Sequence, residues 1–273
     1  MIINYDSPGQ LCNRIWSLLP SIAYGLEYKK KVLIINFEEY SGCFENLNKN
    51  KLISFASYKL LKRFFLSLKA RGYIRNGQPN IFSKLFGLNL IEGWSNRLGN
   101  VEMIEKQSEE IRDIFRFKKE VADAVDSFFS LSQDVITIGI HIRRGDYKDW
   151  LNGVFYYNDE VYLQIIKDLE AQLRLEGKKV KFLLCSNEKI DMSCFGEFDC
   201  FVIPQSSGIK DLCALSKCDF IVGPPSSYSQ WASFYGKVPL RFLMACDQEL
   251  KLKDFSVITA LSKFENGEIL NID

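Results

Sequence analysis

The sequence predicts an α/β fold of two Rossmann-like lobes with parallel sheets that face a cleft. Short, fully apolar runs rich in β-branched residues recur along the chain, and such runs are typical of strands buried on both faces of a parallel sheet. Segments with helical spacing lie between them, most regularly after about residue 134, which indicates βαβ units. A chain of 273 residues with 47% hydrophobic content is long enough for one large or two small domains. We expect a first lobe over residues 1–132 and a second over 133–273.

The predicted elements alternate between strands and helices along the chain. After a first strand at the N-terminus, the expected strands are the apolar runs 31–37, 135–142, 180–185, 200–203, 220–223 and 238–243. The expected helices are 10–28, 108–130, 159–175, 209–217 and 229–235. Residues 38–100 mix loops, aromatics and basic residues without a regular pattern. The first lobe is therefore predicted in less detail than the second.

The composition limits the classes of partner. The 35 basic and 34 acidic residues nearly cancel, so no global field would hold the chain on nucleic acid or on an anionic membrane. The eight cysteines form no C-x-x-C pair and have no histidine close by, which argues against a zinc site and a dense disulfide framework. Neither a secretory leader nor an apolar run of about 18 residues is present. We expect a reduced, cytosolic protein, and any attraction to phosphate must be local.

The strongest motif is the end of the apolar run 135–142, where His141 is followed by Arg143, Arg144 and the turn residues Gly145 and Asp146. In open α/β sheets, ligands lie beyond the carboxyl ends of strands. An arginine there stays charged and binds oxygens bidentately, which suits a diphosphate. Residues two apart on a strand share a face, so Arg143 lies on the side of His141 and Arg144 on the other. The alternative is a structural ion-pair network with a satisfied core histidine, but paired arginines ending an apolar strand are expensive without a partner.

A second constellation spans residues 211–232, where a helix led by Asp211 runs into a strand, a Gly-Pro-Pro turn and serines that open the next helix. Helix N-termini attract phosphate, and the hydroxyls of Ser226 and Ser227 add donors. A carboxylate at Asp211 can accept from the N1 and N2 donors of a guanine edge. The alternative is ordinary capping by Ser226, Ser227 and Ser229, with Asp211 capping its own helix.

Two further stretches carry weaker signals. Residues 6–14 form a strand-to-helix loop in which Gly9 permits close approach and Asn13 and Arg14 fall on the first turns of the helix. Neither G-x-G-x-x-G nor G-x-x-x-x-G-K-[ST] occurs in the sequence, so dehydrogenase and P-loop interpretations lose their main support. Residues 58–71 mix basic and bulky apolar side chains at near-helical spacing. This stretch is either a peripheral membrane contact or a packed helix with a solvated basic face.

The motif at residues 141–147 resembles the H-x-R-R-G-D-Y strand end of the alpha-1,2-fucosyltransferase family and, more distantly, the alpha-1,6- and protein O-fucosyltransferases. The loop 9–14 is similar to the family's N-terminal Gly-rich loop, although members typically carry a Gly-Gly-x-Gly-Asn run. Residues 211–227 are similar to the family's D-x-x-x-L-S-x-x-D-F-x-V stretch with its serine pair. The resemblance therefore supports membership of the superfamily more strongly than it supports a particular acceptor linkage.

The resemblance implies a GT-B arrangement with an N-terminal acceptor-side lobe and a C-terminal lobe that binds the nucleotide sugar. It implies inverting, metal-independent transfer of fucose from GDP-fucose to a glycan, with bacterial relatives acting on surface polysaccharide or lipid-linked oligosaccharide. Carried over by position, Arg143 holds the β-phosphate, His141 lies beside the nucleoside and Asp211 reads guanine. Donor contacts implied at the remaining positions are those of Asn13, Arg144, Ser226 and Ser227.

The expected mechanism is departure of GDP as an acceptor hydroxyl attacks, with Arg143 stabilising the charge that grows on the β-phosphate. Asp146 is the nearest candidate for a general base, and Asp6, Glu92 and Asp149 are weaker candidates. A rival enzyme would use another nucleotide sugar, such as GDP-mannose or a UDP- or dTDP-sugar, on the same scaffold. A rival of another class is a catalytically silent protein that binds a sugar nucleotide or a glycan.

Overall fold

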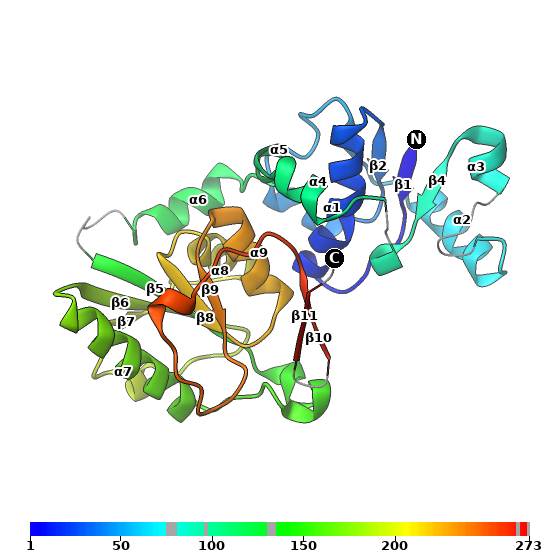
Figure 1. Cartoon of the computed structure of the whole chain (residues 1–273). Helices are drawn as coiled ribbons and strands as arrows, with labels where there is room; N and C mark the ends of the chain where they lie inside the picture. Colours follow the sequence, from blue (N-terminus) through cyan, green and yellow to red (C-terminus); the bar gives the residue numbers. More distant parts are fainter. Residues whose placement is uncertain (75–80, 96–97, 130–134, 266–267, 272–273) are drawn as a thin grey trace. The chain divides into compact units, whose positions relative to one another are not determined.

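The structure is a computed structural model that describes residues 1–74, 81–95, 98–129, 135–265 and 268–271. The chain forms two compact units, Met1–Lys119 and Glu120–Ile272, and each contains its own parallel sheet (Figure 1). The predicted boundary between residues 132 and 133 falls within 130–134, outside the described residues. No helix in the described ranges combines the length and the apolarity that a membrane crossing needs.

The first unit is built on a four-stranded parallel sheet with the order β3-β2-β1-β4. Its strands are β1 (Ile2–Asn4), β2 (Val32–Ile34), β3 (Ile53–Phe55) and β4 (Asn89–Ile91). Its helices are α1 (Leu11–Glu27), α2 (Lys59–Ala70), α3 (Ile81–Phe86), α4 (Val101–Lys106) and α5 (Ser108–Ile114). Short 3-10 turns lie at η1 (Glu38–Cys43) and η2 (Gly93–Ser95). The strands β3 and β4 and the helix α3 fall in the stretch 38–100, where the sequence predicted no strand or helix apart from the near-helical spacing of residues 58–71, which corresponds to α2.

The second unit contains a five-stranded parallel sheet with the order β7-β6-β5-β8-β9. Its strands are β5 (Val135–Ile142), β6 (Lys179–Ser186), β7 (Cys200–Phe201), β8 (Phe220–Gly223) and β9 (Leu240–Phe242). Its helices are α7 (Asp159–Leu175), α8 (Gly208–Leu215) and α9 (Ser227–Gly236), and α6 (Lys119–Asp126) begins at the boundary. The remaining elements are the antiparallel pair β10 (Ser262–Glu265) and β11 (Glu268–Asn271) and the 3-10 turns η3 (Gly145–Lys148), η4 (Trp150–Gly153), η5 (Met192–Phe195) and η6 (Leu252–Asp254).

Strand β5 divides the core of the second unit into two faces. Ile138, Ile140 and Ile142 are buried in one cluster with side chains of α7, whereas an added Cβ at Gly139 would lie 2.6 Å from Leu215 of α8. Figure 1 shows the same arrangement, with α7 on one side of the sheet and α8 and α9 on the other. Odd-numbered residues of β5 therefore face α8 and α9, as strand alternation requires.

The predicted helix over residues 108–130 is wrong in its continuity. The structure has α5 ending at Ile114 and α6 beginning at Lys119. Between them, Phe117 forms an antiparallel bridge with Phe44, and Phe115 packs edge-on against Phe37, Phe44 and Phe55. Burial of these two aromatic rings within the first unit is favourable enough to interrupt the helix.

Candidate active site

The order of strands in the second sheet reverses between β5 and β8. From β5 the chain continues through β6 to β7 on one side, and β8 and β9 then lie on the other side. Ligands in open α/β sheets bind outside the carboxyl ends of the strands at such a reversal. The loops that begin at Arg143 and at Pro224 flank this point, because they follow β5 and β8 directly.

His141 is buried at this reversal without being satisfied. Its side chain is on the face of α9, with its ring centroid 5.1 Å from that of Tyr228, and the residue is only 3% exposed. Within the described part of the chain, Nδ1 has no hydrogen-bond partner. Burial, together with the nearby charge of Arg143, lowers the pKa of the imidazole to about 3. The histidine is therefore neutral at physiological pH and differs from a satisfied core histidine.

Arg143 keeps one donor unused. Its Nη2 donates to Asp146 at 2.9 Å, and its guanidinium carbon lies 5.5 Å from the centroid of the Tyr147 ring. Its Nε is buried without a partner among the described residues, although the side chain as a whole is 22% exposed. Two neighbouring side chains, Arg143 and His141, thus each present an unpaired nitrogen, which is costly unless a ligand satisfies it.

Arg144 lies on the opposite face, as the strand alternation predicted. Its Nη2 pairs with Asp159 at the start of α7 at 2.5 Å, and its Nε donates to the Tyr157 carbonyl at 3.2 Å. Its guanidinium also lies 5.9 Å from the centroid of the Tyr162 ring. These contacts attach the end of β5 to α7, so we assign Arg144 a structural role rather than a place among the donor-binding residues.

The loop after β8 approaches β5 closely. A Cβ added at Gly223 would lie 2.5 Å from the carbonyl oxygen of His141, so only glycine permits this approach. The hydroxyl of Tyr147, which follows β5, donates to the Pro225 carbonyl after β8. Burial raises the pKa of Tyr147 to about 12, so this hydroxyl remains a donor. The two loops of the site are thereby held together.

Ser226 caps α9, and Ser227 is the first residue of that helix. The Ser226 hydroxyl accepts from the backbone N–H of Tyr228 at 3.2 Å, which confirms the capping interpretation for this serine. Helix α9 has ten residues and begins directly after the loop that follows β8, the strand in which Gly223 packs against His141 of β5, and a helix N-terminus carries the positive end of the helix dipole. Capping and anion binding are compatible here, because the N-terminal turn presents several N–H groups.

Asp211 lies in the first turn of α8 but does not cap it. The helix begins at Gly208, one residue before the predicted start, and its N-cap residue is Ser207, so the alternative in which Asp211 caps its own helix is wrong. The carboxylate accepts a hydrogen bond from the Ser206 hydroxyl, and the Tyr228 hydroxyl donates to the Gly208 carbonyl at 2.6 Å. Burial raises the pKa of Asp211 to about 6. Asp211 is thus linked through α8 and Tyr228 to the face that carries His141.

A second polar cluster lies in the first unit, where the strand order reverses between β1 and β4. Within the described ranges, the buried Asp6 Oδ1, Tyr5 hydroxyl and Asn36 Oδ1 find no partners. Burial raises the pKa of Asp6, against the lowering effects of Lys69, Lys62 and Arg14. The sequence pattern missed Tyr5 and Asn36, although Tyr5 follows β1 directly and Asn36 lies two residues beyond β2, positions that could have pointed to them.

Asn13 also belongs to this cluster and not to the second unit. It lies in the first turn of α1, where a Cβ at Gly9 would be 2.4 Å from its Nδ2. Gly9 has a φ of +56°, which favours glycine. Arg14, one residue further, donates to the Gly9 carbonyl and to the Asn36 carbonyl, each at 3.2 Å. The loop at Gly9 therefore packs against the first turn of α1.

The other base candidates have different surroundings. Glu92 forms an ion pair with Lys69, Asp149 is exposed, and the Asp146 side chain is 61% exposed and paired with Arg143. In the part of the chain that the structure describes, no group of three His, Cys, Asp or Glu side chains is placed to hold a metal ion.

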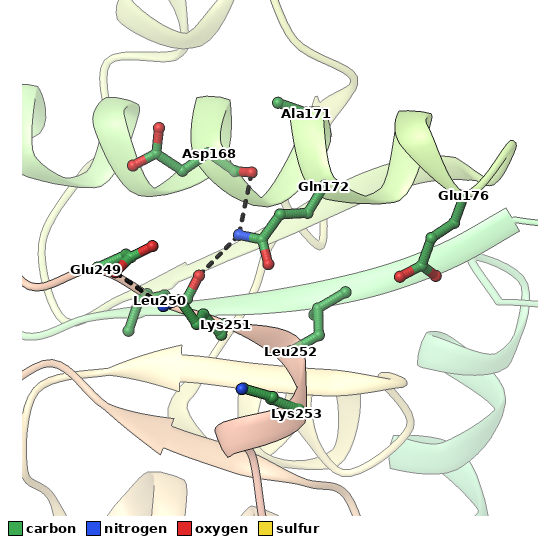
Figure 2. Close-up of a pocket in the computed structure, with 9 residues that line it drawn as sticks. All are labelled: Asp168, Ala171, Gln172, Glu176, Glu249, Leu250, Lys251, Leu252 and Lys253. Carbon is green, nitrogen blue, oxygen red and sulfur yellow. Dashed lines mark hydrogen bonds and ion pairs between the residues drawn. The ribbon is translucent and has the colours of Figure 1, made fainter.

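A pocket of about 650 Å³ lies elsewhere in the second unit, between α7 and residues 249–253 (Figure 2). Gln172 crosses it, donating to the Asp168 carbonyl at 3.3 Å and to the Leu250 carbonyl at 2.7 Å. It borders the C-terminal half of α7, whereas the reversal of the sheet lies near Asp159 at the N-terminal end. We do not assign the pocket to the active site.

Solved structures of similar fold place the chain in a class. The NodZ alpha-1,6-fucosyltransferase, a Bradyrhizobium protein, in a crystal soaked with GDP-fucose is 15% identical, with a TM-score of 0.56 over 88% of this chain and 93% of that one. A mutant of Arabidopsis thaliana FUT1 in complex with GDP is 13% identical, with a TM-score of 0.58 over 89% of this chain and 70% of that one. POFUT1 in complex with GDP-fucose is 11% identical, with a TM-score of 0.57 over 89% of this chain and 98% of that one. The fold is therefore that of the GT-B-like glycosyltransferases, which confirms the predicted α/β fold class.

The family is defined by the sequence itself. Residues 28–238 match glycosyl transferase family 11, and the chain belongs to this family. It is a glycosyltransferase. None of the curated proteins compared with the chain matches it.

Proposed function

We propose that the chain transfers fucose from GDP-fucose to a hydroxyl of a glycan, with inversion at the anomeric carbon and without a metal. The observation that carries the proposal is the pair of unpaired buried nitrogens, Arg143 Nε and His141 Nδ1, where the second sheet reverses. Structures of similar fold that contain GDP or GDP-fucose support this choice of donor. The same two nitrogens are donors or acceptors that a bound nucleotide would satisfy.

The diphosphate is proposed to lie between the loops after β5 and β8. Arg143 supplies a fixed positive charge, and the N-terminus of α9 supplies N–H groups beside Ser226 and Ser227. As the bond from C1 of fucose to the β-phosphate oxygen breaks, negative charge grows on that phosphate. Donors that are already oriented for this charge lower the barrier by several kcal/mol. We propose that the neutral His141, in the same part of the site, binds the nucleoside portion.

Asp211 is proposed to select guanine. An ionised carboxylate accepts from both N1 and N2 of guanine, whereas uracil and thymine do not present this pair of donors. The half-buried position in the first turn of α8 limits competition from water. A pKa of about 6 leaves the group ionised at neutral pH and protonated under mildly acidic conditions.

We assign Asp146 the role of orienting Arg143 and propose Asp6 as the general base. A carboxylate that already accepts from a guanidinium at 2.9 Å is committed to that pair, and Asp146 faces solvent. Asp6 is half-buried at the carboxyl end of β1, with one oxygen unpaired and a raised pKa. A raised pKa strengthens a carboxylate as a proton acceptor. The first unit is accordingly the proposed acceptor side.

The linkage we propose is alpha-1,2, and the acceptor is a glycan of surface polysaccharide or lipid-linked oligosaccharide. Both rest on the resemblance of residues 141–147 and 211–227 to the alpha-1,2-fucosyltransferases. The family match over residues 28–238 includes both motifs.

A thermal-shift series with GDP, GDP-fucose, GDP-mannose, UDP and dTDP tests the donor. A ligand that binds only the folded chain raises its Tm. At a concentration one hundred times its Kd, such a ligand adds about 2.7 kcal/mol to the free energy of unfolding. We expect shifts with GDP and GDP-fucose and none with UDP or dTDP. A larger shift with GDP-mannose than with GDP-fucose, or shifts with UDP alone, would assign the scaffold to another nucleotide sugar. Tight GDP binding without hydrolysis or transfer of fucose would indicate a silent binding protein.

A further inference from the structure

Helix α2 uses only one of its faces to fold. Phe65 is buried with Ile3, Tyr5 and Ile35, and Leu61 and Leu68 pack against the same cluster. Leu60 is 81% exposed, and Phe64 and Leu66 are also exposed. These outward side chains therefore take no part in the core of the first unit, and their apolar character is not explained by burial within that unit.

Helix α3 extends this exposed apolar face. The Phe82 ring contacts Phe64 of α2 with centroids 6.4 Å apart, and it contacts Phe86 at 6.5 Å. Leu85 and Phe86 are both exposed. Figure 1 shows α2 and α3 side by side within the first unit. We call this region the α2–α3 surface and define it by Leu60, Arg63, Phe64, Tyr73, Leu85 and Phe86.

The charge of the α2–α3 surface has one sign. Residues 58–73 contain five basic and no acidic residues, although the whole chain carries a net charge of only +1. Lys62 donates to the Ser7 hydroxyl at 2.7 Å, and Lys69 pairs with Glu92. Lys59, Arg63 and Arg71 have no ion-pair partner in the ranges that the structure describes. Exposed apolar rings and unpaired cations thus occupy one surface.

We infer that the α2–α3 surface binds the face of an anionic lipid bilayer. Apolar side chains of an amphipathic surface enter the boundary between headgroups and acyl chains, while basic residues contact lipid phosphates. Each basic residue near such a surface strengthens binding by about fivefold. A second copy of the chain fits less well, because two surfaces of the same positive charge would repel each other. The inference does not depend on the donor sugar, and its test uses no nucleotide.

Sedimentation with vesicles tests the inference. The full chain is mixed with vesicles of phosphatidylcholine alone or of equal parts phosphatidylcholine and phosphatidylglycerol, at low and high salt. We expect the chain to sediment with the anionic vesicles, to sediment less at high salt, and to remain mostly in solution with neutral ones. The double variant Leu60→Ser with Arg63→Glu should weaken anionic binding more than tenfold, since it removes an inserted side chain and reverses a charge.

A matched double variant supplies the control. Leu175→Ser with Lys178→Glu makes the same kind of change at and just beyond the end of α7, where Leu175 is 90% exposed and Lys178 is exposed. It should sediment like the unchanged chain, and both double variants should keep its far-ultraviolet circular dichroism and Tm. Equal loss in both double variants, or no preference for anionic vesicles, overturns the inference. Concentration-dependent dimers that Leu60→Ser with Arg63→Glu abolishes, without vesicle binding, would instead identify a second copy as the partner.

Discussion

Replacing Arg143 by alanine should reduce turnover far more than it reduces stability. The ion pair that is lost joins Arg143 to Asp146 at 2.9 Å, and the Asp146 side chain is 61% exposed. Exposed pairs contribute about 0.2–1 kcal/mol, and the contact with the Tyr147 ring contributes about 0.5–1 kcal/mol. We therefore expect the free energy of unfolding to fall by about 1–2 kcal/mol. The loss of one oriented donor at a developing charge costs about a hundred- to a thousandfold in kcat.

Two measurements separate these effects. Urea unfolding followed by circular dichroism gives the change in stability, and release of GDP from GDP-fucose in the presence of acceptor gives kcat. Arg143→Lys should recover only part of the turnover, because lysine keeps the charge but not the planar fork. Asp146→Ala should retain turnover within about tenfold, since it removes the orienting carboxylate but leaves the guanidinium.

Arg144→Ala is the matched control, and it should reduce stability more than it reduces turnover. Its pair with Asp159 is shorter, at 2.5 Å, and both side chains are better shielded. Loss of a charged hydrogen bond in such a setting costs about 1.5–3 kcal/mol. We expect Arg144→Ala to lose more stability and less turnover than Arg143→Ala. Near-normal kcat in Arg143→Ala, or a greater loss of stability there than in Arg144→Ala, would refute the assignment of the two arginines.

Three further perturbations test separate parts of the site. GDP affinity, measured by calorimetry, should fall as the pH drops below about 6, because burial raises the pKa of Asp211 to that value and protonation removes a guanine acceptor. Unfolding should not cause this loss, since a raised pKa means that proton uptake at Asp211 favours the folded state as the pH falls from about 6 toward 3.8. A GDP affinity that stays constant from neutral to acidic pH would contradict the role of Asp211 in binding guanine. Gly223→Ala should cost about 1–3 kcal/mol, because its Cβ would lie 2.5 Å from the His141 carbonyl oxygen, whereas Gly196→Ala has its nearest contact at 3.5 Å and should change little; equal urea midpoints would argue against this packing. Asp6→Asn should slow transfer by about a hundredfold or more while GDP binds as before, and unchanged transfer would remove Asp6 as the base.

The second unit could be predicted from the sequence because its strands are long or fully apolar. The predicted bounds of β5, β8 and α7 coincide with those of the structure. Alternation along β5 also predicted that Arg144 leaves the face of His141, and its contacts with Asp159 and Tyr162 of α7 agree with this. These features follow from local rules of strand geometry, which one sequence contains in full.

The first unit was predicted poorly because its decisive strands are short. Strands β3 and β4 have three residues each, too few for a periodic pattern to appear. Without β4, the reversal beside β1 was not visible, and Asp6 had no setting that distinguished it from other carboxylates. The break before Lys119 depends on the burial of Phe115 against rings distant in sequence, which helical spacing does not report.

The state of the polar atoms could not be predicted either. A sequence shows that a histidine follows an apolar strand, but it does not show whether its nitrogens find partners. The structure distinguishes the two arginines. Arg143 has one unpaired nitrogen, whereas Arg144 contacts Asp159 in α7 and the Tyr157 carbonyl just before that helix. That difference decides which of two adjacent, chemically identical side chains is available to a ligand.

His141 is the only histidine in the chain, and its position gives the protein a built-in spectroscopic reporter. Its ring signals in a carbon–proton correlation spectrum would need no assignment by mutation, since no other imidazole contributes. Because burial keeps this ring neutral down to a pH of about 3, its chemical shifts would not drift with buffer across the working range. Occupancy of the site by any nucleotide could therefore be followed in solution through one residue, without a label attached to either molecule.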